Sequence, residues 1–355
     1  MRSIFEQVLY IGPDIAVKGR GGISSVMRLY SECINPFNYL RTNSANGTIY
    51  GLLALIKTLL ILPFYRWFRN LKIVHIHGAA GKSFVRKTVI IKLAKILGYK
   101  IVFHCHSGYF KDYVEKVGRE KICAILSDCD AIVALSNGWK KYFEEDLGFK
   151  NVYVVNNIVY KVDVYKENNK NNKLQVLFLG LICDNKGIFD LIDVLAEHKK
   201  EFENKIELQI GGAGEDERLQ RIILERELTK IVKPLGWVLG EHKNEIIRNC
   251  DVFILPSYVE GVPISILEAM ANRKAIIAST IGGIPEIVEN MRSGILHNPG
   301  DKVAIYNALK FFMDNPEKCV EYGLVGYKIV ESYYPQSVIK QLKYLYSNML
   351  ETINH

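Results

Sequence analysis

Short apolar runs alternate with longer amphipathic stretches along the whole chain. Most of these runs lack an in-and-out alternation of apolar and polar residues, which predicts parallel strands covered on both faces. The predicted strands are residues 8–12, 72–77, 100–105, 131–135, 152–155, 174–180, 206–212, 251–255 and 275–279. Because helix-period stretches separate them, the pattern indicates an α/β fold with doubly wound sheets.

The segment 160–173 is rich in Asn and Lys and poor in apolar residues, which is typical of an exposed domain connection. The second half then opens with strand, glycine and helix, as the first half does. We therefore expect two Rossmann-like domains, residues 1–159 and 160–335, that face each other across a cleft. A ligand shared by such sheets would lie at the carboxyl ends of their strands. The amphipathic stretch 336–355 can fold back onto the first domain.

Composition fits a soluble globular protein, since 355 residues suffice for two ordinary cores and 49% of them are hydrophobic. No N-terminal signal peptide is visible. The seven scattered cysteines favour reduced thiols in a cytosolic chain. Charge is uneven: residues 1–157 hold 22 Lys and Arg against 11 Asp and Glu, whereas the remainder is slightly acidic. The basic character therefore belongs to the first half.

Residues 256–270, PSYVEGVPISILEAM, place two glutamates in different settings. A helix is expected to begin near Pro263 or Ile264, so that the N–H groups of Ile264 and Ser265 could bind an anion. Glu260 precedes this helix and could simply compensate its dipole. Glu268 lies one turn inside it, as a surface residue or among apolar neighbours, where a carboxylate needs a partner.

The form EGVPISILEAM resembles the signature of retaining GT-B glycosyltransferases, especially glycosyltransferase family 4. Other segments resemble that family in the expected order along nearly the whole chain, most closely from 174 to 300. They are GRGGISSV (19–26), FLGLICDNKGIFDLI (178–192), LQIGGAGED (208–216), LGWV (235–238), and then IGGIPEIVE and SGIL. The resemblance implies a GT-B architecture of two Rossmann-like domains.

The resemblance also assigns roles to individual residues. Glu268 would accept hydrogen bonds from the ribose hydroxyls of a nucleotide, and Glu260 from hydroxyls of the donor sugar. The two would thus hold opposite ends of one nucleotide-sugar instead of acting as an acid and base pair. Lys186 would neutralise the leaving diphosphate, and His106 would position the reacting end of the sugar. An isolated lysine would otherwise be a solvated loop residue.

Five glycines belong to the same implied nucleotide-sugar site, because a backbone without Cβ can approach a ligand closely. They are Gly21, Gly22, Gly180, Gly212 and Gly261, together with the helix-start residues Ile264 and Ser265. A lone glycine pair would more often be a turn.

Two departures from the family pattern stand out. Leu181 occupies the place where the family usually has an arginine, so that a second cation for the diphosphate would have to come from elsewhere, for example Lys18 or Arg20. Arg273 and Ala275 replace an expected glycine and proline after the glutamate helix, where we expect Asn272 to adopt a left-handed, helix-ending conformation.

A metal site is not expected. His104, Cys105 and His106 end one strand, but Cys105 points away from the two histidines and no further His or Cys group supports chelation. His75 and His77 end another strand and are expected to pack or hydrogen-bond there, with His77 nearer the cleft. The donor is expected to be a substrate, and no cofactor is implied.

The resemblance therefore implies a retaining glycosyltransferase that moves a sugar from a nucleotide-diphosphate sugar to a sugar or lipid-linked acceptor, in bacterial polysaccharide synthesis. The family's usual account is a front-face displacement in which the departing phosphate helps to deprotonate the acceptor. Two alternatives stay open: a catalytically impaired nucleotide-sugar-binding partner, which Leu181 suggests, and a nucleotide-sugar epimerase. A dinucleotide oxidoreductase and a nucleic-acid binder lack their motifs.

Residues 51–69 hold an apolar run that we expect to be too short, and too interrupted by Lys57 and Pro63, to span a bilayer. The run is either a buried helix or, because aromatic residues and arginines mix at its end, a membrane-interface helix. Cations follow it at Lys72, Lys82, Arg86, Lys87, Lys92, Lys95 and Lys100. We expect a cytoplasmic protein that binds the anionic inner face of the cell membrane peripherally.

Overall fold

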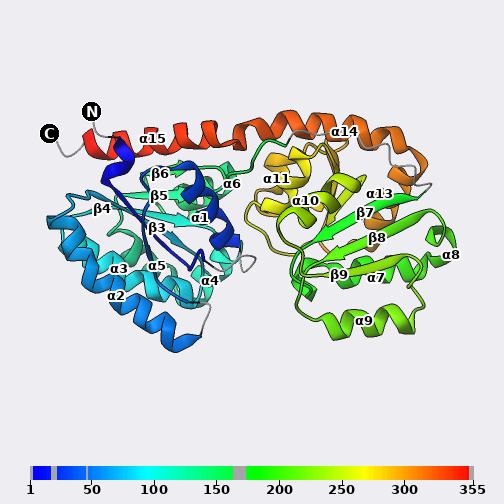
Figure 1. Cartoon of the computed structure of the whole chain (residues 1–355), viewed down its shortest axis with the longest axis horizontal. Helices are drawn as coiled ribbons and strands as arrows, with labels where there is room; N and C mark the ends of the chain where they lie inside the picture. The colour runs from blue at the N-terminus through cyan, green and yellow to red at the C-terminus, as the bar shows by residue number, and fades with distance from the viewer. Residues whose placement is uncertain (1–2, 17–21, 45–46, 163–172, 352–355) are drawn as a thin grey trace. The chain divides into compact units, whose positions relative to one another are not determined.

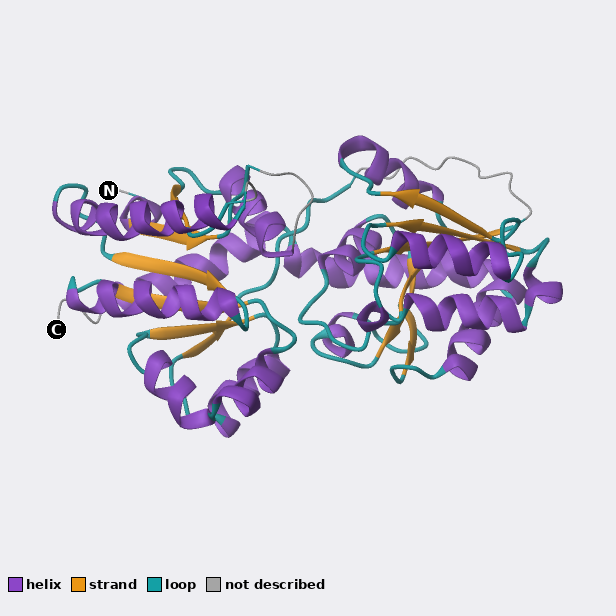
Figure 2. Cartoon of the chain, turned by 90° about the horizontal axis from the view of Figure 1, so that it is seen from below, coloured by secondary structure: helices purple, strands orange, loops and turns teal. Residues whose placement is uncertain are grey.

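The computed structural model describes residues 3–16, 22–44, 47–162 and 173–351 (Figure 1). The chain divides into two compact units. The first unit comprises Met1–Ile158 together with Pro335–His355, and the second comprises Val159–Tyr334. Each unit has its own parallel sheet with helices on both sides (Figure 2), which confirms the α/β, doubly wound fold class. Gly21, Lys18 and Arg20 lie outside the described residues, as does most of the segment 160–173.

In the first unit the described residues form a six-stranded parallel sheet in the order β2-β1-β3-β4-β5-β6. Its strands are β1 Val8–Gly12, β2 Asn38–Arg41, β3 Ile73–Gly78, β4 Lys100–Cys105, β5 Ala131–Ala134 and β6 Val152–Val154. Its helices are η1 Ile4–Gln7, α1 Gly22–Cys33, α2 Thr48–Trp67, α3 Lys82–Ile96, α4 Phe110–Val117, α5 Arg119–Leu126, α6 Asn137–Lys141, η2 Tyr142–Asp146 and α15 Pro335–Glu351.

In the second unit the described residues form a six-stranded parallel sheet in the order β12-β11-β10-β7-β8-β9. Its strands are β7 Leu174–Leu179, β8 Ile206–Gly211, β9 Val232–Gly236, β10 Val252–Leu255, β11 Ala275–Ser279 and β12 Gly294–His297. Its helices are η3 Asp184–Lys186, α7 Ile188–Glu197, α8 Lys199–Phe202, α9 Asp216–Glu225, α10 Gly240–Asn249, α11 Ile264–Ala271, α12 Ile284–Ile287, α13 Lys302–Asp314, α14 Pro316–Ile329 and η4 Val330–Tyr333.

The strand order of the second sheet contains a topological switch point between β7 and β10. From β7 the chain builds β8 and β9 to one side, and it then returns to build β10, β11 and β12 on the other side. Open α/β sheets bind ligands at such a switch point, outside the carboxyl ends of the two strands. The first sheet has its switch point between β1 and β3.

The central strands match the apolar runs, whereas three edge strands were missed as strands. β2, β9 and β12 are edge strands, and each is only partly buried. An edge strand is covered on fewer sides and so needs no continuous apolar run. β9 also contains Pro234, which cannot donate to a sheet hydrogen bond and is tolerated at an edge.

Helix α15 belongs to the first unit although it follows the second in sequence. The side chains of Val338, Leu342, Leu345 and Tyr346 are buried. The Gln341 side-chain oxygen accepts a hydrogen bond of 2.9 Å from the N–H of Asn156.

Helix α2 is longer than the apolar run indicated. It covers Thr48–Trp67, 20 residues, and by length and composition alone it is apolar enough to cross a membrane. The expectation that the run is too short was therefore wrong, because the helix begins three residues earlier and Pro63 does not interrupt it. Core helices of soluble proteins can pass the same test, but here only 22% of the most apolar 18-residue window is buried.

Candidate functional site

The loop from β10 to α11 carries the first of the two glutamates. Helix α11 begins at Ile264 after an extended Pro263, which confirms the expected helix start. Ile264 and Ser265 therefore occupy its first turn, where backbone N–H groups have no partner within the helix. Glu260 lies in the loop, with a side chain that is 11% exposed.

Glu260 forms an ion pair with Lys186, the last residue of η3. The Ser257 hydroxyl also donates a hydrogen bond of 2.9 Å to the Glu260 carboxylate. Lys186 follows β7 and Glu260 follows β10, so that the pair spans the switch point of the second sheet. This geometry places a cation and a hydrogen-bond acceptor side by side at the switch point, where open α/β sheets bind ligands.

Gly187 fixes the distance between these two loops. Its φ is 65°, a left-handed value, and a Cβ at this position would lie 1.9 Å from the Pro256 carbonyl oxygen. The N–H of Tyr258 donates a hydrogen bond of 2.9 Å to the carbonyl of Asn185. Only glycine permits this close approach, and the loop after β7 is thereby held against the loop after β10.

Glu268, one turn inside α11, also has a cationic partner. Lys243 in the first turn of α10 lies 2.6 Å from its carboxylate. This ion pair supplies the partner that a carboxylate among apolar neighbours needs. Lys243 was missed, because the sequence around it looks like an ordinary charged helix and only the fold brings α10 against α11.

The candidate glycines occupy three loops at the same end of the second sheet. Gly180 follows β7 and Gly212 follows β8, and a Cβ on Gly212 would lie 1.9 Å from the Gly180 carbonyl oxygen. Gly261 follows Glu260, and its carbonyl accepts a 2.7 Å hydrogen bond from the N–H of Gly283. In the first unit Gly22 begins α1 on the exposed surface.

Leu181, at the place of the expected arginine, is 52% exposed and adds no charge. A cation that sequence reasoning did not consider lies close to η3: Arg218 of α9 pairs with Asp184 at 3.0 Å. Its guanidinium carbon also lies 3.7 Å from the ring centroid of Phe189, and Glu215 is a second carboxylate partner. Two carboxylates already balance this charge, so Arg218 does not simply replace the missing arginine.

The end of α11 differs from the expectation. Asn272 has a φ of −93°, and the left-handed residue is Arg273, with a φ of 57°. The Asn272 amide instead donates a 2.8 Å hydrogen bond to the Glu268 carbonyl and caps the helix. Arg273 thus takes the conformation of the glycine that it replaces, with its guanidinium over the Tyr327 ring.

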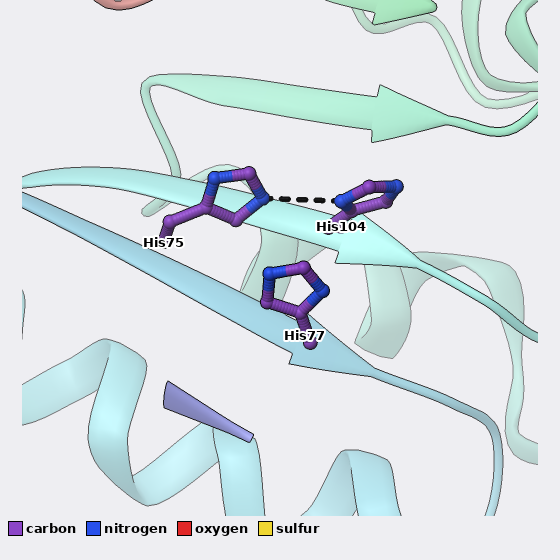
Figure 3. Close-up of side chains that lie close together, drawn as sticks. All are labelled: His75, His77 and His104. Atoms are coloured by element: carbon purple, nitrogen blue, oxygen red, sulfur yellow. Dashed lines mark hydrogen bonds between the residues drawn. The ribbon is translucent and has the colours of Figure 1, made fainter. Parts of the chain in front are cut away.

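Four histidines gather at the carboxyl ends of β3 and β4 in the first unit. His75 Nε2 and His104 Nδ1 are 3.1 Å apart, and His77 Nδ1 and His106 Nε2 are 2.8 Å apart. Figure 3 shows His75, His77 and His104. His77 and His104 are opposite each other in the parallel register. The expectation that no further histidines join His104 and His106 was wrong, because adjacent in-register strands bring the two His-x-His pairs together.

This histidine cluster is held in its neutral form. Burial away from water lowers the pKa of His75 and His106 to about 3, and it lowers the pKa of His77 and His104 well below the ordinary value. Nitrogens of His75, His77 and His104 lie within 4.8 Å of one another, close enough to share a metal ion. His77 is fully buried rather than facing a cleft, and His106 is the more exposed member.

Lys87 on α3 lies deep in the same unit and not on the basic surface to which we assigned it. Its side chain is buried, its ammonium group contacts the Thr42 hydroxyl, and burial lowers its pKa to about 7. No feature of the sequence distinguishes Lys87 from the exposed lysines of the same helix.

Comparison with protein families matches both units to glycosyltransferase domains. Residues 41–160 match the family described as Glycosyltransferase Family 4. Residues 161–328 match the family described as Glycosyl transferases group 1. The boundary between the two matches lies within three residues of the boundary between the two units.

Two curated relatives illustrate the range of the similarity. The phosphatidylinositol N-acetylglucosaminyltransferase GPI3 subunit of Saccharomyces cerevisiae is 23% identical over 287 residues, 78% of this chain. The match spans 61% of that relative's own length. The amylovoran biosynthesis glycosyltransferase AmsK of Erwinia amylovora is 30% identical over 141 residues, which are 37% of this chain and 34% of AmsK.

Solved structures share the fold. Sucrose-phosphate synthase from Thermosynechococcus elongatus superposes with a TM-score of 0.82 at 18% identity, over 98% of this chain and all of that one. Anabaena HepE in complex with UDP-glucose superposes with a TM-score of 0.74 at 16% identity, over 97% of this chain and 99% of that one. At these identities the likeness establishes the GT-B fold.

Proposed function

We propose that this chain, which is a pair of glycosyltransferase domains with the GT-B fold, transfers a sugar from a nucleotide-diphosphate sugar to an acceptor with retention of the anomeric configuration. The observation that carries the proposal is the Lys186–Glu260 pair at the switch point of the second sheet. A sugar diphosphate offers an anion and vicinal hydroxyls at adjacent positions, and the pair offers a cation and an acceptor at adjacent positions.

Lys186 and Glu260 pair with each other when no ligand is bound, and each would contact a different part of a bound donor. The diphosphate would take over the Lys186 ammonium group, and hydroxyls of the sugar would donate to the Glu260 carboxylate in its place. As the sugar–phosphate bond breaks, negative charge builds on the phosphate oxygens, and a cation that is already in position stabilises it. Ser257 would keep the carboxylate oriented throughout.

Glu268 would accept from the ribose hydroxyls in the same way. Lys243, its partner at 2.6 Å, restricts the orientation of the carboxylate before the nucleotide arrives. The N–H groups of Ile264 and Ser265 would add an anion-binding element at the start of α11. Gly180, Gly212 and Gly261 would let the backbone come close to the donor.

In the first unit, the family resemblance would give His106 a role in positioning the reacting end of the donor sugar, and Gly21 and Gly22 a role in binding the phosphate or the acceptor. The lowered pKa of His106 makes it a neutral hydrogen-bonding group at physiological pH. We expect no metal requirement for the transfer, because Lys186 supplies the positive charge that the leaving group needs. Transfer in the presence of EDTA tests this, and strict dependence on a divalent ion would contradict it.

The relatives support the proposed donor class, and the proposed acceptor class rests on the family resemblance of the sequence. HepE was solved with UDP-glucose, which supports a nucleotide-diphosphate sugar as donor. AmsK is named for amylovoran biosynthesis, and we propose a sugar or lipid-linked sugar of a bacterial polysaccharide as acceptor. A thermal-shift screen of nucleotide-sugars identifies the donor. NMR coupling constants of the anomeric proton in the product then test retention, and an inverted product overturns it.

A second candidate is a catalytically impaired, nucleotide-sugar-binding partner of an assembly complex, which the uncharged Leu181 favours. Release of free nucleotide that depends on acceptor distinguishes the enzyme from such a partner. Conversion of the donor to an epimer without any acceptor would instead identify a nucleotide-sugar epimerase.

A further inference from the structure

Helix α2 presents an apolar stripe to solvent. Its members recur every three or four residues and so share one side of the helix. They are Ile49, Leu53, Ile56, Leu60, Phe64 and Trp67, all of them exposed, with Leu60 at 74% and Trp67 at 68%. A soluble protein rarely exposes so many large apolar side chains together, unless they meet a partner.

The opposite side of α2 is already packed in the first unit. Ala54, Thr58 and Leu62 are buried, and they recur every four residues on the side away from the stripe. The Thr58 hydroxyl donates a 2.7 Å hydrogen bond to the Arg41 carbonyl. Tyr99 likewise donates a 2.7 Å hydrogen bond to the Leu62 carbonyl. The helix is therefore apolar on two sides, and only one of them packs against the rest of the first unit.

The neighbouring helix α3 repeats this feature beside α2 (Figure 1). Val85, Val89 and Ile96 are exposed on α3. Lys82, Lys92 and Lys95 are exposed on the same helix. Aromatic residues gather where α2 ends, since the rings of Phe64 and Phe68 stack with centroids 4.9 Å apart.

Charge identifies the partner of this surface. Between Glu32 and Asp112 the sequence has no Asp or Glu and has twelve Lys or Arg. A second copy of the chain would bring this basic segment against itself, and the repulsion opposes a symmetric dimer. An anionic lipid surface attracts the same cations and accepts the apolar and aromatic side chains between them.

We propose that the stripe of α2, with the exposed side chains of α3, docks the first unit onto an anionic lipid bilayer, with α2 lying in the plane of the interface. A membrane-spanning α2 would have to leave the Thr58 and Leu62 contacts that fix it in the unit. Lys57, on the exposed part of the helix, would then sit near the middle of the hydrocarbon. In the interface, by contrast, Lys57 reaches the headgroups.

Docking is tested by co-sedimentation of the full chain with vesicles of phosphatidylglycerol and phosphatidylcholine, and with vesicles of phosphatidylcholine alone, at low and high salt. We expect binding to the anionic vesicles at low salt, release at high salt, and weak binding to the neutral ones. Leu60→Glu should lower the partition coefficient by about tenfold or more, because it places a charge in the stripe.

Leu224→Glu is the matched control, since Leu224 is 67% exposed on α9 of the second unit and should leave binding unchanged. A variant with Trp139→Phe and Trp237→Phe keeps Trp67 as its one tryptophan. Its emission should shift to the blue on anionic vesicles and be quenched by brominated lipid tails. This second readout does not depend on the folding of the Leu60→Glu variant.

Three outcomes would overturn the proposal. Failure to bind either kind of vesicle at low salt removes the lipid partner. Binding that neither salt nor carbonate reverses indicates a spanning helix. Vesicle-independent self-association that Leu60→Glu abolishes indicates a second copy on the stripe. None of these measurements uses a donor or an acceptor, so the result is independent of the proposed transfer activity.

Discussion

Lys186 and Glu260 are 74 positions apart in the sequence and form an ion pair at the switch point of the second sheet, between the loops that follow β7 and β10. Neither side chain needs solvent or a ligand to be satisfied, although both face the part of the fold that binds ligands in open α/β sheets. A donor would leave each side chain with a hydrogen-bonding partner, because the diphosphate would contact Lys186 and the sugar hydroxyls would donate to Glu260. In the proposed function the ion pair is therefore a preorganised site for the sugar diphosphate.

Replacing each glutamate in turn distinguishes the contacts to the nucleotide from the contacts to the sugar of the proposed donor. Glu268→Ala should weaken the binding of free nucleotide, because it removes the acceptor for the ribose hydroxyls. Glu260→Ala should leave free-nucleotide binding nearly intact and lower transfer by about 10²-fold or more. Isothermal titration with the nucleotide and initial rates with the nucleotide-sugar measure the two effects. Equal loss of nucleotide affinity in both variants would contradict this division.

Lys186→Ala tests the leaving-group role. A cation that acts on charge developing in the transition state matters more to turnover than to ground-state binding. The variant should fold normally and lose most of its kcat at saturating donor. Lys243→Ala is the matched comparison, since it removes a lysine from the other glutamate and should raise the Kd of the nucleotide more than it lowers kcat. A Lys186→Ala enzyme with near-normal kcat would show that another residue stabilises the leaving phosphate.

The sequence predicted the central strands, from their apolar runs, and the candidate site residues, from their motifs. The central strands are apolar on both faces. Of the motif positions, Lys186 lies in η3 after β7, Glu260 in the loop after β10, and Glu268 one turn inside α11. The edge strands β2 and β9 escaped notice because burial on fewer sides leaves no apolar run. The pattern thus records burial: it missed the partly buried edge strands β2, β9 and β12, although it found the edge strand β6.

The sequence also could not predict which side chains contact each other in the folded protein. Lys243 meets Glu268, and Lys87 is buried beside Thr42, but neither lysine differs in its local sequence from an exposed one. The meeting of the His75–His77 pair with the His104–His106 pair was within reach of sequence reasoning. Two His-x-His strands that are adjacent and parallel must place their histidines on one face when their registers match.

Gly187→Ala tests the close contact between the loop after β7 and the loop after β10. The added Cβ would overlap the Pro256 carbonyl oxygen, which is backbone and cannot rotate away, and alanine also disfavours the φ of 65°. Gly236→Ala is the control for backbone strain alone, since Gly236 has a φ of 67° and its Cβ would meet no atom within 4 Å.

We expect Gly236→Ala to cost about 1 kcal/mol of unfolding free energy and Gly187→Ala about 1–3 kcal/mol more. Only Gly187→Ala should also impair transfer, because the Lys186 and Glu260 loops must move apart. Urea unfolding of both variants, with initial rates, checks this. Similar losses of stability in the two variants would mean that the loops can move apart to accommodate the added Cβ at little cost in free energy.

The neutral histidine cluster predicts that the first unit loses stability in acid. The pKa of His75 and His106 is lowered to about 3 and that of His77 and His104 still more clearly, whereas an unfolded histidine titrates near 6.5. Between pH 6.5 and about 3 the unfolded chain therefore binds protons that the folded chain excludes. The stability from this cluster is complete above pH 6.5 and falls as the pH falls.

The groups that face the cluster do not offset this loss. Tyr10 and Tyr346 stay neutral because burial raises their pKa values, and Lys87, with a pKa of about 7, becomes positively charged as the pH falls. Each histidine that stays neutral should cost about 1.4 kcal/mol per pH unit below 6.5. Hydrogen exchange of the β3 and β4 amides from pH 7 to pH 5, corrected for the intrinsic exchange rate, measures the loss. His75→Gln should reduce the slope with pH, and the exposed His242→Gln in the second unit should not; an unchanged slope in His75→Gln would show that other groups govern the acid sensitivity of the first unit.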